Sequence, residues 1–199
     1  AALQRHGATS GRAVDVGCGG GGLWRHLQAS GATFSSYCGL DAVRYDAWPE
    51  RADFHQVDLD SSAWSVGEAQ ADVVVSVETI EHLENPWGFM RQLARLARPG
   101  GLVIVTTPNQ LSGLSLLTLL TKQRFSAFQD AHYPAHRTSL LESDLQRATT
   151  AAGLELIETV YSGLGRLPLS ARHYPAALAS LAPRWLSDNL MVVARRPRG

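Results

Sequence analysis

Charged residues are scarce in this 199-residue chain, and the two signs are balanced. They make up 18% of the residues, with 18 arginines and lysines against 18 aspartates and glutamates. A formal net charge of zero argues against a protein that grips a phosphate backbone mainly by charge, so we expect no strong nucleic-acid binding. The two cysteines, Cys18 and Cys38, are too few for a disulfide framework. We therefore expect reduced thiols and a cytoplasmic protein.

Long apolar runs are also missing. No stretch approaches the ~20 apolar residues that a membrane-spanning helix needs, and the first residues show no basic-then-apolar signal pattern. Hydrophobic residues still make up 45% of the chain, which is enough to bury a core at this length. Internal repeats and low-complexity linkers are absent from the sequence, so we expect a single domain over residues 1–199.

Apolar runs alternate with helical patterns, which is typical of an α/β fold with a mostly parallel sheet. The pattern predicts seven strands, at residues 12–16, 36–40, 53–57, 71–77, 102–106, 154–161 and 189–194. It predicts helices at residues 21–29, 86–97, 139–152 and 176–181. The segment 109–135 is longer than an ordinary connection between a strand and a helix. We expect it to form a helical lid inserted after the fifth strand.

A glycine-rich turn, VDVGCGGGG, follows the first predicted strand. Such a turn between a strand and a helix lets backbone N–H groups approach a ligand with no Cβ in the way. Gly17, Gly19 and Gly22 fit the dinucleotide pattern G-x-G-x-x-G, although four consecutive glycines make that match weak. A tight turn that binds no ligand is the alternative.

Three aspartates accompany this turn. Asp41 ends the second strand, where it can accept both hydroxyls of a ribose, and Asp58 ends the third, where it can reach a base amine. Asp15 lies two residues before Gly17, and a carboxylate there would repel a pyrophosphate and attract a cation. S-adenosylmethionine (SAM) carries an adenosine, an ammonium and a sulfonium without a phosphate. These positions therefore favour SAM over NAD.

Two carboxylates and an imidazole follow the fourth strand in the sequence ETIEH. In a helical turn, positions i, i+3 and i+4 share a face, so we expect Glu78, Glu81 and His82 to converge at the carboxyl edge of the sheet. A divalent metal such as Mg²⁺, Mn²⁺ or Zn²⁺ would neutralise them, with a fourth ligand from His132 or His136 in the lid region. A metal-free catalytic or positioning role and a purely structural role are the alternatives.

These motifs together resemble those of class I SAM-dependent methyltransferases. DVGCGGG, GLDA, VDLD, VSVETIEHLENP and ARPGGLVIVTTPN carry the resemblance, over about residues 12–152. The family implies a Rossmann-like sheet of seven strands, mostly parallel, with the last strand antiparallel and helices on both faces. It also implies a SAM site formed by Asp15, Gly17, Cys18, Gly19 and Gly21 for the methionine part, Asp41 and Ala42 for the ribose, Asp58 and Leu59 for the adenine, and Val77 beside the cofactor.

Two groups within this superfamily are similar around ETIEH. Ubiquinone-pathway O-methyltransferases have a similar E-x-x-E-H and a later histidine, and small-RNA 3′-end 2′-O-methyltransferases use such residues to hold a metal. The matching positions here are Glu78, Glu81, His82 and His136, because HRTSLLESDL places His136 nine residues before a helix leucine. A second histidine soon after His136 and the aromatic signatures of the RNA enzymes are missing. The resemblance therefore favours O-methylation of a small molecule, with His82 or His136 as the catalytic base or as metal ligands.

The lid region begins with LSGLSLLTLL, whose leucines form a broad apolar face. Three interpretations stay open: the face covers an apolar part of the substrate, lies on a membrane surface, or packs in the core or against a second subunit. Three other functions also stay open, namely methylation of an RNA end, a SAM-binding regulator without catalysis, and an NAD oxidoreductase. The sequence identifies neither the acceptor nor the oligomeric state.

Overall fold

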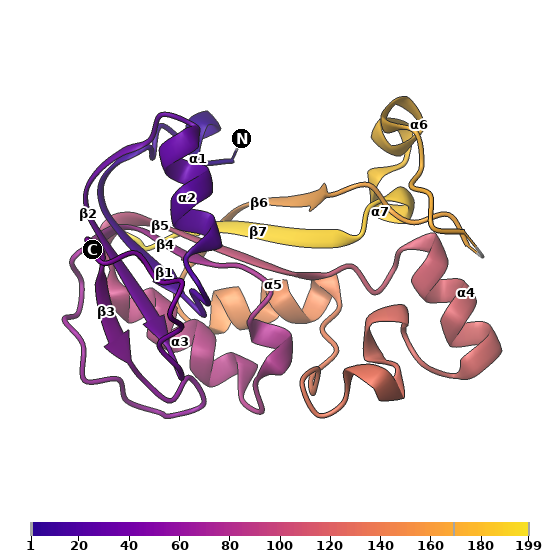
Figure 1. The fold of residues 1–199 in the computed structure, drawn as a ribbon, viewed down its shortest axis with the longest axis horizontal. Helices are drawn as coiled ribbons and strands as arrows, with labels where there is room; N and C mark the ends of the chain where they lie inside the picture. The colour runs from indigo at the N-terminus through magenta and orange to yellow at the C-terminus, as the bar shows by residue number, and fades with distance from the viewer. Residues whose placement is uncertain (1, 169, 199) are drawn as a thin grey trace.

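The computed structural model describes residues 2–168 and 170–198. Its centre is a seven-stranded sheet with the strand order β3-β2-β1-β4-β5-β7-β6 (Figure 1). The strands are β1 (Ser10–Val16), β2 (Thr33–Asp41), β3 (Asp53–Gln56), β4 (Ala71–Ser76), β5 (Ala97–Pro108), β6 (Glu155–Ser162) and β7 (Asn189–Arg195). The first five pair in parallel, and β7 runs antiparallel between β5 and β6. The predicted Rossmann-like sheet with an antiparallel last strand is confirmed.

Helices cover both faces of the sheet (Figure 1). They are α1 (Ala2–Arg5), α2 (Gly22–Ala29), α3 (Pro86–Leu96), α4 (Gly113–Lys122), α5 (Glu142–Ala151), α6 (Ala176–Leu181) and α7 (Pro183–Leu186). Helices α3 and α5 lie on one face, whereas α1 and α2 lie on the other. The four helices predicted from the pattern are present. Helices α1 and α7 have four residues each, too few to give a hydrophobic period in the sequence.

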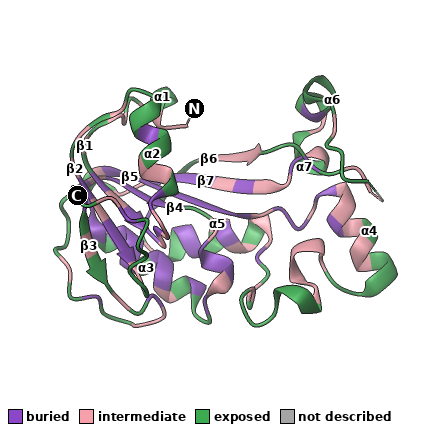
Figure 2. Cartoon of the chain, viewed as in Figure 1, coloured by how far each residue is buried: buried purple, intermediate pink, exposed green. Residues whose placement is uncertain are grey.

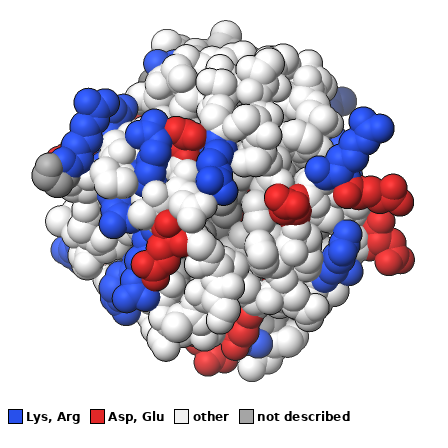
Figure 3. All heavy atoms as spheres, turned by 90° about the vertical axis from the view of Figure 1, so that its left-hand side faces the viewer, with Lys and Arg blue, Asp and Glu red and all other residues white. Residues whose placement is uncertain are grey.

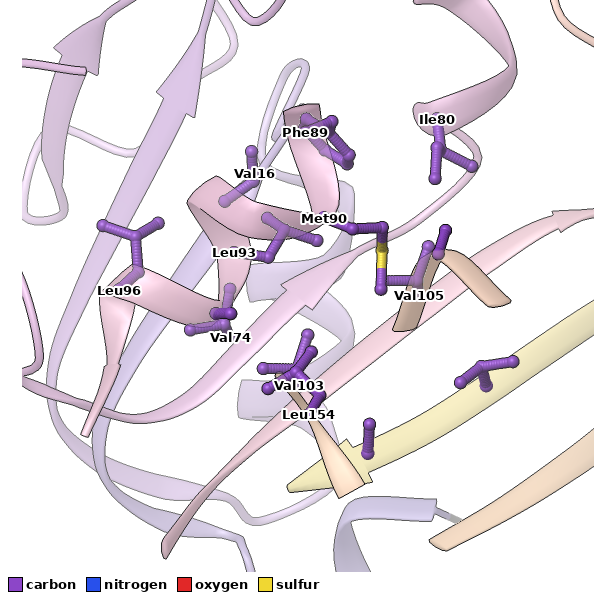
Figure 4. Close-up of a cluster of buried hydrophobic side chains, with 14 of the residues drawn as sticks. Val16, Val74, Ile80, Phe89, Met90, Leu93, Leu96, Val103, Val105 and Leu154 are labelled. Carbon is purple, nitrogen blue, oxygen red and sulfur yellow. The ribbon is translucent and has the colours of Figure 1, made fainter. Parts of the chain in front are cut away.

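The main core lies between the sheet and helices α3 and α5 (Figure 4). Phe89, Met90 and Leu93 of α3 are at most 1% exposed, and they pack over Val74 and Val103 of the two central strands. Because alternate residues of a strand face opposite sides, Val73 and Val75 belong instead to an apolar cluster on the other face. Strand β4 is therefore buried from both sides (Figure 2), as its unbroken apolar sequence predicts.

Local sequence fixes the connection from β4 to α3 at the carboxyl edge of the sheet. The side-chain oxygen of Asn85 accepts a hydrogen bond from the Gly88 N–H at 2.8 Å, and Pro86 occupies the first helical turn. An N-cap asparagine followed by proline is a strong start signal for a helix. The ETIEH segment therefore lies between two well-defined ends, β4 and α3.

The segment 109–135 contains α4 and two short 3₁₀ turns, Ser126–Phe128 and Asp130–His132. Helix α4 projects away from the sheet beyond the end of β5 (Figure 1). Ser115 is its buried residue, while Leu117 and Leu120 are 41% and 83% exposed. Within residues 2–168 and 170–198, no helix combines the length and the apolar character needed to span a bilayer.

Candidate functional site

A cavity of about 530 Å³ lies at the carboxyl edge of the sheet, beyond the ends of β1, β2 and β4. Five of the ten residues predicted to bind the cofactor line it, and so do two of the residues predicted to bind a metal. The lining residues are Gly17, Asp41, Ala42, Tyr45, Asp58, Leu59, Asp60, Glu78, Thr79, His82, Leu83 and Arg137. The aspartates that end β2 and β3 therefore share one cavity with the ETIEH segment.

The glycine turn after β1 is held close to its neighbours. Gly17 has a φ of 74°, and a Cβ at this position would collide with the side chain of Thr79. The Gly19 N–H donates a hydrogen bond to Oδ2 of Asp41 at 2.8 Å, so the turn is tied to the end of β2. Gly21 directly precedes α2, as its N-cap. The turn is thus packed against Thr79, hydrogen-bonded to the end of β2 and followed directly by α2.

Asp15, two residues before Gly17, is buried, with 2% of its surface exposed. Its Oδ2 accepts a hydrogen bond from the Tyr37 hydroxyl at 2.7 Å. Burial raises the pKa of Asp15 to about 7, against the effect of the Tyr37 hydrogen bond, and the charge of Asp41 adds to the rise. Burial also raises the pKa of the neighbouring Cys18 thiol, followed by the charge of Asp15. The Asp15 side chain is therefore tied to β2 and is outside the set of residues that line the cavity.

The loop after β3 forms the opposite wall of the cavity. Asp58 is exposed, and its Oδ1 accepts a hydrogen bond from the Asp60 N–H at 3.0 Å. Asp60 in turn accepts hydrogen bonds from the N–H groups of Glu84 and Asn85 at 2.8 and 3.1 Å. Leu59, between the two aspartates, is buried. This loop is thereby joined to the start of α3.

The conformation of ETIEH differs from the helical turn that we expected. Ile80–His82 form a single 3₁₀ turn, whereas Glu78 has a φ of 50° in the left-handed region. Glu78 is held there by Thr106, whose hydroxyl accepts from the Glu78 N–H and donates to its Oε1 at 2.8 Å. Burial raises the pKa of the Glu78 carboxyl above its ordinary value. The expectation that Glu78 shares a helical face with Glu81 and His82 is therefore wrong.

Three of the four predicted metal ligands do come together. One ligand atom from each of Glu81, His82 and His136 lies within 4.8 Å of the others. The His82 and His136 Nδ1 atoms each contact a backbone carbonyl at 2.7 Å, of Ala135 and Ala127 respectively. A carbonyl oxygen can only accept a hydrogen bond, so each Nδ1 carries the proton. Each Nε2 is left with a free lone pair, as a metal ligand or a proton acceptor requires.

Glu81 is the buried member of this cluster, with 1% of its surface exposed. Burial raises the pKa of its carboxyl to about 8, and the charge of Glu78 adds to the rise. Its Oε2 accepts a hydrogen bond from the Thr107 hydroxyl at 3.3 Å. A buried acid beside two imidazoles is costly unless something compensates its charge. The donor set of one carboxylate and two imidazoles therefore fits a divalent cation.

Backbone hydrogen bonds hold the segment that contains His136 beside Glu81. The N–H groups of Arg137 and Thr138 both donate to the Glu81 carbonyl, at 2.9 and 3.0 Å. The ring of His132 stacks on that of His136 with 5.4 Å between centroids, but His132 is exposed and outside the cluster of three. Burial lowers the pKa of His136 below its ordinary value. The choice of His136 over His132 agrees with this geometry.

Other residues of the site have weaker signals in the sequence or none. Asp60 is the second acid of VDLD, and its part in joining two loops was not anticipated. Tyr45 and Arg137 line the cavity from loops without a recognisable pattern. Val77, predicted to lie beside the cofactor, lines a different cavity on the other face of the sheet.

Comparisons with known proteins find related methyltransferases. A family model described as a methyltransferase domain matches residues 1–159. The ubiquinone biosynthesis O-methyltransferase of Rhizobium leguminosarum bv. trifolii is 27% identical over 153 residues, which cover 74% of this chain and 60% of the relative. A probable S-adenosylmethionine-dependent methyltransferase of Mycolicibacterium smegmatis is 30% identical over 156 residues, which cover 75% of this chain and 56% of the relative.

Solved structures share the fold. The crystal structure of a SAM-dependent methyltransferase from Archaeoglobus fulgidus superposes with a TM-score of 0.67 at 14% identity, covering 98% of this chain and 91% of that one. The chain therefore spans nearly all of a solved protein with this fold, but only 60% and 56% of the length of the two sequence relatives.

Proposed function

The chain belongs to the methyltransferase domain family, and on this premise we propose that it transfers a methyl group from SAM to a hydroxyl group of a small molecule. The observation that carries the proposal is the single cavity at the carboxyl edge of the sheet. It joins the acids that end β2 and β3 to Glu78 and His82. In this proposal the cofactor and a group able to accept a proton share one cavity.

The cofactor would lie with its adenosine toward Asp41 and Asp58. Asp41 is suited to accept hydrogen bonds from the ribose hydroxyls, and Asp58 with Leu59 is suited to hold the adenine. The methionine part would then lie over the glycine turn, above the buried Asp15. The positive charge of the ammonium and the sulfonium would favour the ionised form of that carboxyl.

The reaction needs alignment and the removal of one proton. The acceptor oxygen attacks the methyl carbon in line with the sulfur, a C–O bond forms as the S–C bond breaks, and S-adenosylhomocysteine leaves. Holding the two reactants in line can supply ~7–11 kcal/mol of the barrier. The hydroxyl proton would pass to Nε2 of His82, the free nitrogen of an imidazole that lines the cavity. Such proton transfer contributes roughly 10²–10⁴-fold.

A divalent metal fits the same residues. Glu81, His82 and His136 would hold it, and when bound it would lower the pKa of a hydroxyl beside it. The carbonyls of Ala135 and Ala127 orient the two imidazoles for this role by fixing their tautomers. Glu78, which the sequence pattern also assigned as a metal ligand, is instead hydrogen-bonded to Thr106. In this version His82 acts as a ligand and not as the base.

The lid supports an acceptor with an apolar part. Leu117 and Leu120 of α4 are exposed, so they remain available to a ligand or to a membrane surface on which such an acceptor resides.

On the face shown in Figure 3, arginine and lysine side chains are interspersed with aspartates and glutamates. That distribution gives no support to binding of a phosphate backbone on this face, and a small molecule is favoured over an RNA end.

Methyl transfer is tested by incubating the purified protein with methyl-labelled SAM and a set of hydroxylated acceptors, including catechol. We expect label in the methoxy product and its loss in His82→Ala. His173→Ala, an exposed histidine outside the cavity, is the matched control and should keep full activity. SAM binding without transfer to any acceptor class would favour a non-catalytic regulator and contradict the proposal.

The metal is tested separately. We expect EDTA to abolish transfer and added Mg²⁺, Mn²⁺ or Zn²⁺ to restore it, with His136→Ala losing metal binding in calorimetry. Full activity in EDTA, with no metal in the purified protein, would remove the metal and leave His82 as the base.

A further inference from the structure

A second cavity lies on the other face of the sheet. It has a volume of about 210 Å³ and is lined by α1, α2 and the central strands. Its walls are largely apolar, with Leu3 from α1, Leu23 from α2, Val75 and Ile104 from β4 and β5, and Met191 from β7. These side chains belong to the apolar cluster on this face. The cavity is therefore a gap in a hydrophobic layer and not a polar surface groove.

At its carboxyl end the cavity lies beside the candidate active site. Val77 and Thr106, at the ends of β4 and β5, line it there. The Thr106 hydroxyl donates a hydrogen bond to Oε1 of Glu78, and Glu78 lines the proposed cofactor cavity. Val77 is 40% exposed, so the rim at this point is open to solvent. The two cavities thus meet at one hydrogen-bonded pair of side chains.

Helix α1, which closes the cavity, is anchored across the sheet. The Arg5 guanidinium and Nε2 of His6 both lie 2.8 Å from Oε1 of Glu158 on β6. This tether holds a helix of four residues against strands that it would otherwise contact only weakly. The wall formed by Leu3 is therefore fixed in place.

We propose that this second cavity holds the apolar substituent of the acceptor while its hydroxyl faces Glu78 and His82. The inference rests on the proposed function, because it assigns a part of the substrate of that reaction. The occupant is a short alkyl or aryl group of the hydroxylated acceptor. Its apolar character matches the walls, and the position of the rim beside Glu78 lets one molecule reach both cavities. The volume of about 210 Å³ suits a short substituent and not a polymer.

The test fills the cavity from two sides. Leu23→Phe adds volume from α2, and Ala32→Leu adds volume from the residue that precedes β2. Leu181→Phe, at a position 81% exposed on α6, is the matched control. All three variants are first compared with the wild type by thermal unfolding, so that a misfolded variant is set aside and the second filling variant is used.

The substrates are catechol and its 4-methyl, 4-ethyl and 4-propyl derivatives. In the wild type we expect KM to fall about fourfold for each methylene that enters the cavity, from ~0.8 kcal/mol per buried CH₂. The filling variants should lose this dependence, with unchanged KM for catechol and unchanged Kd for SAM, and the control should keep it. An equal dependence on chain length in wild type and filling variants would overturn the inference.

A binding measurement separates this inference from the proposed reaction. Calorimetry of 4-propylcatechol is carried out with S-adenosylhomocysteine present and needs no turnover. Loss of this binding in the filling variants supports the cavity assignment even if no methyl transfer is found. Methyl transfer to catechol without any effect of filling leaves the proposed function intact and refutes the cavity assignment.

Discussion

Replacing Asp15 with asparagine should stabilise the folded protein at alkaline pH and weaken SAM binding at the same time. The carboxyl is 2% exposed, and burial raises its pKa from an ordinary 3.8 to about 7. The folded protein therefore binds more protons at Asp15 than the unfolded chain between these two values. Stability is lost as the pH rises through this window and levels off above about 7.

The magnitude follows from the two pKa values. At ~1.4 kcal/mol per pKa unit, Asp15 costs the fold about 4 kcal/mol at pH 8, where it is ionised, and about 2 kcal/mol at pH 5, where folding requires it to take up a proton. The asparagine carries no such cost, and its oxygen can still accept the Tyr37 hydrogen bond. If the amide nitrogen of the asparagine has no hydrogen-bond partner, it lowers the free energy of unfolding by ~1–3 kcal/mol, equally at both pH values. The stability of Asp15→Asn relative to wild type should therefore improve by about 2–3 kcal/mol from pH 5 to pH 8.

The assay is urea denaturation of both proteins at pH 5 and pH 8, with SAM affinity measured at pH 8. We expect the affinity of the variant to fall about 10- to 100-fold, because a buried negative charge near a cation is removed. A stability difference that does not change with pH would show that the pKa is not raised. Unchanged SAM affinity would show that Asp15 plays no part in binding the cofactor.

Three further substitutions test the site and the core. Asp41→Ala should lower the affinity for SAM about tenfold or more, since it removes the proposed ribose ligand and the acceptor of the Gly19 N–H. Unchanged affinity in calorimetry would argue against this placement of the ribose. Gly17→Ala should cost ~1–3 kcal/mol in urea denaturation, because φ is 74° and the new methyl meets Thr79; a stable variant would contradict the close approach. Phe89→Ala should cost ~3–5 kcal/mol while the folded fraction binds SAM normally, and a loss below 1 kcal/mol would contradict the core described here.

Most of the fold could be predicted because its signals are local. The apolar run in β4 predicts a strand buried on both faces, and the pattern places α2, α3 and α5 within a few residues. Strand β5 is an exception, since it begins at Ala97, five residues before the predicted start. Ala97 pairs with Ala71, and the register of the two strands shifts before Leu102 pairs with Val73. A bulge of this kind depends on the neighbouring strand, and the apolar pattern alone does not reveal it.

The site could be predicted only in part, because its geometry depends on long-range contacts. The positive φ of Glu78 is held by Thr106, 28 residues away, and nothing within ETIEH signals it. The approach of His136 to Glu81 was expected from the family resemblance, and the hydrogen bonds from Arg137 and Thr138 that produce it cross more than 50 residues. Residue types therefore indicated which groups to consider, while tertiary contacts decide which of these groups meet.

The proposed function requires that the cavity beside Asp41 and Asp58 receive a sulfur nucleoside without phosphate groups. Calorimetric titration of the unmodified protein with SAM, S-adenosylhomocysteine and NAD tests it most directly. We expect SAM and S-adenosylhomocysteine each to bind with a stoichiometry of one molecule per chain, and NAD to give no heat of binding. Saturable binding of NAD, with no binding of SAM under the same conditions, would contradict it.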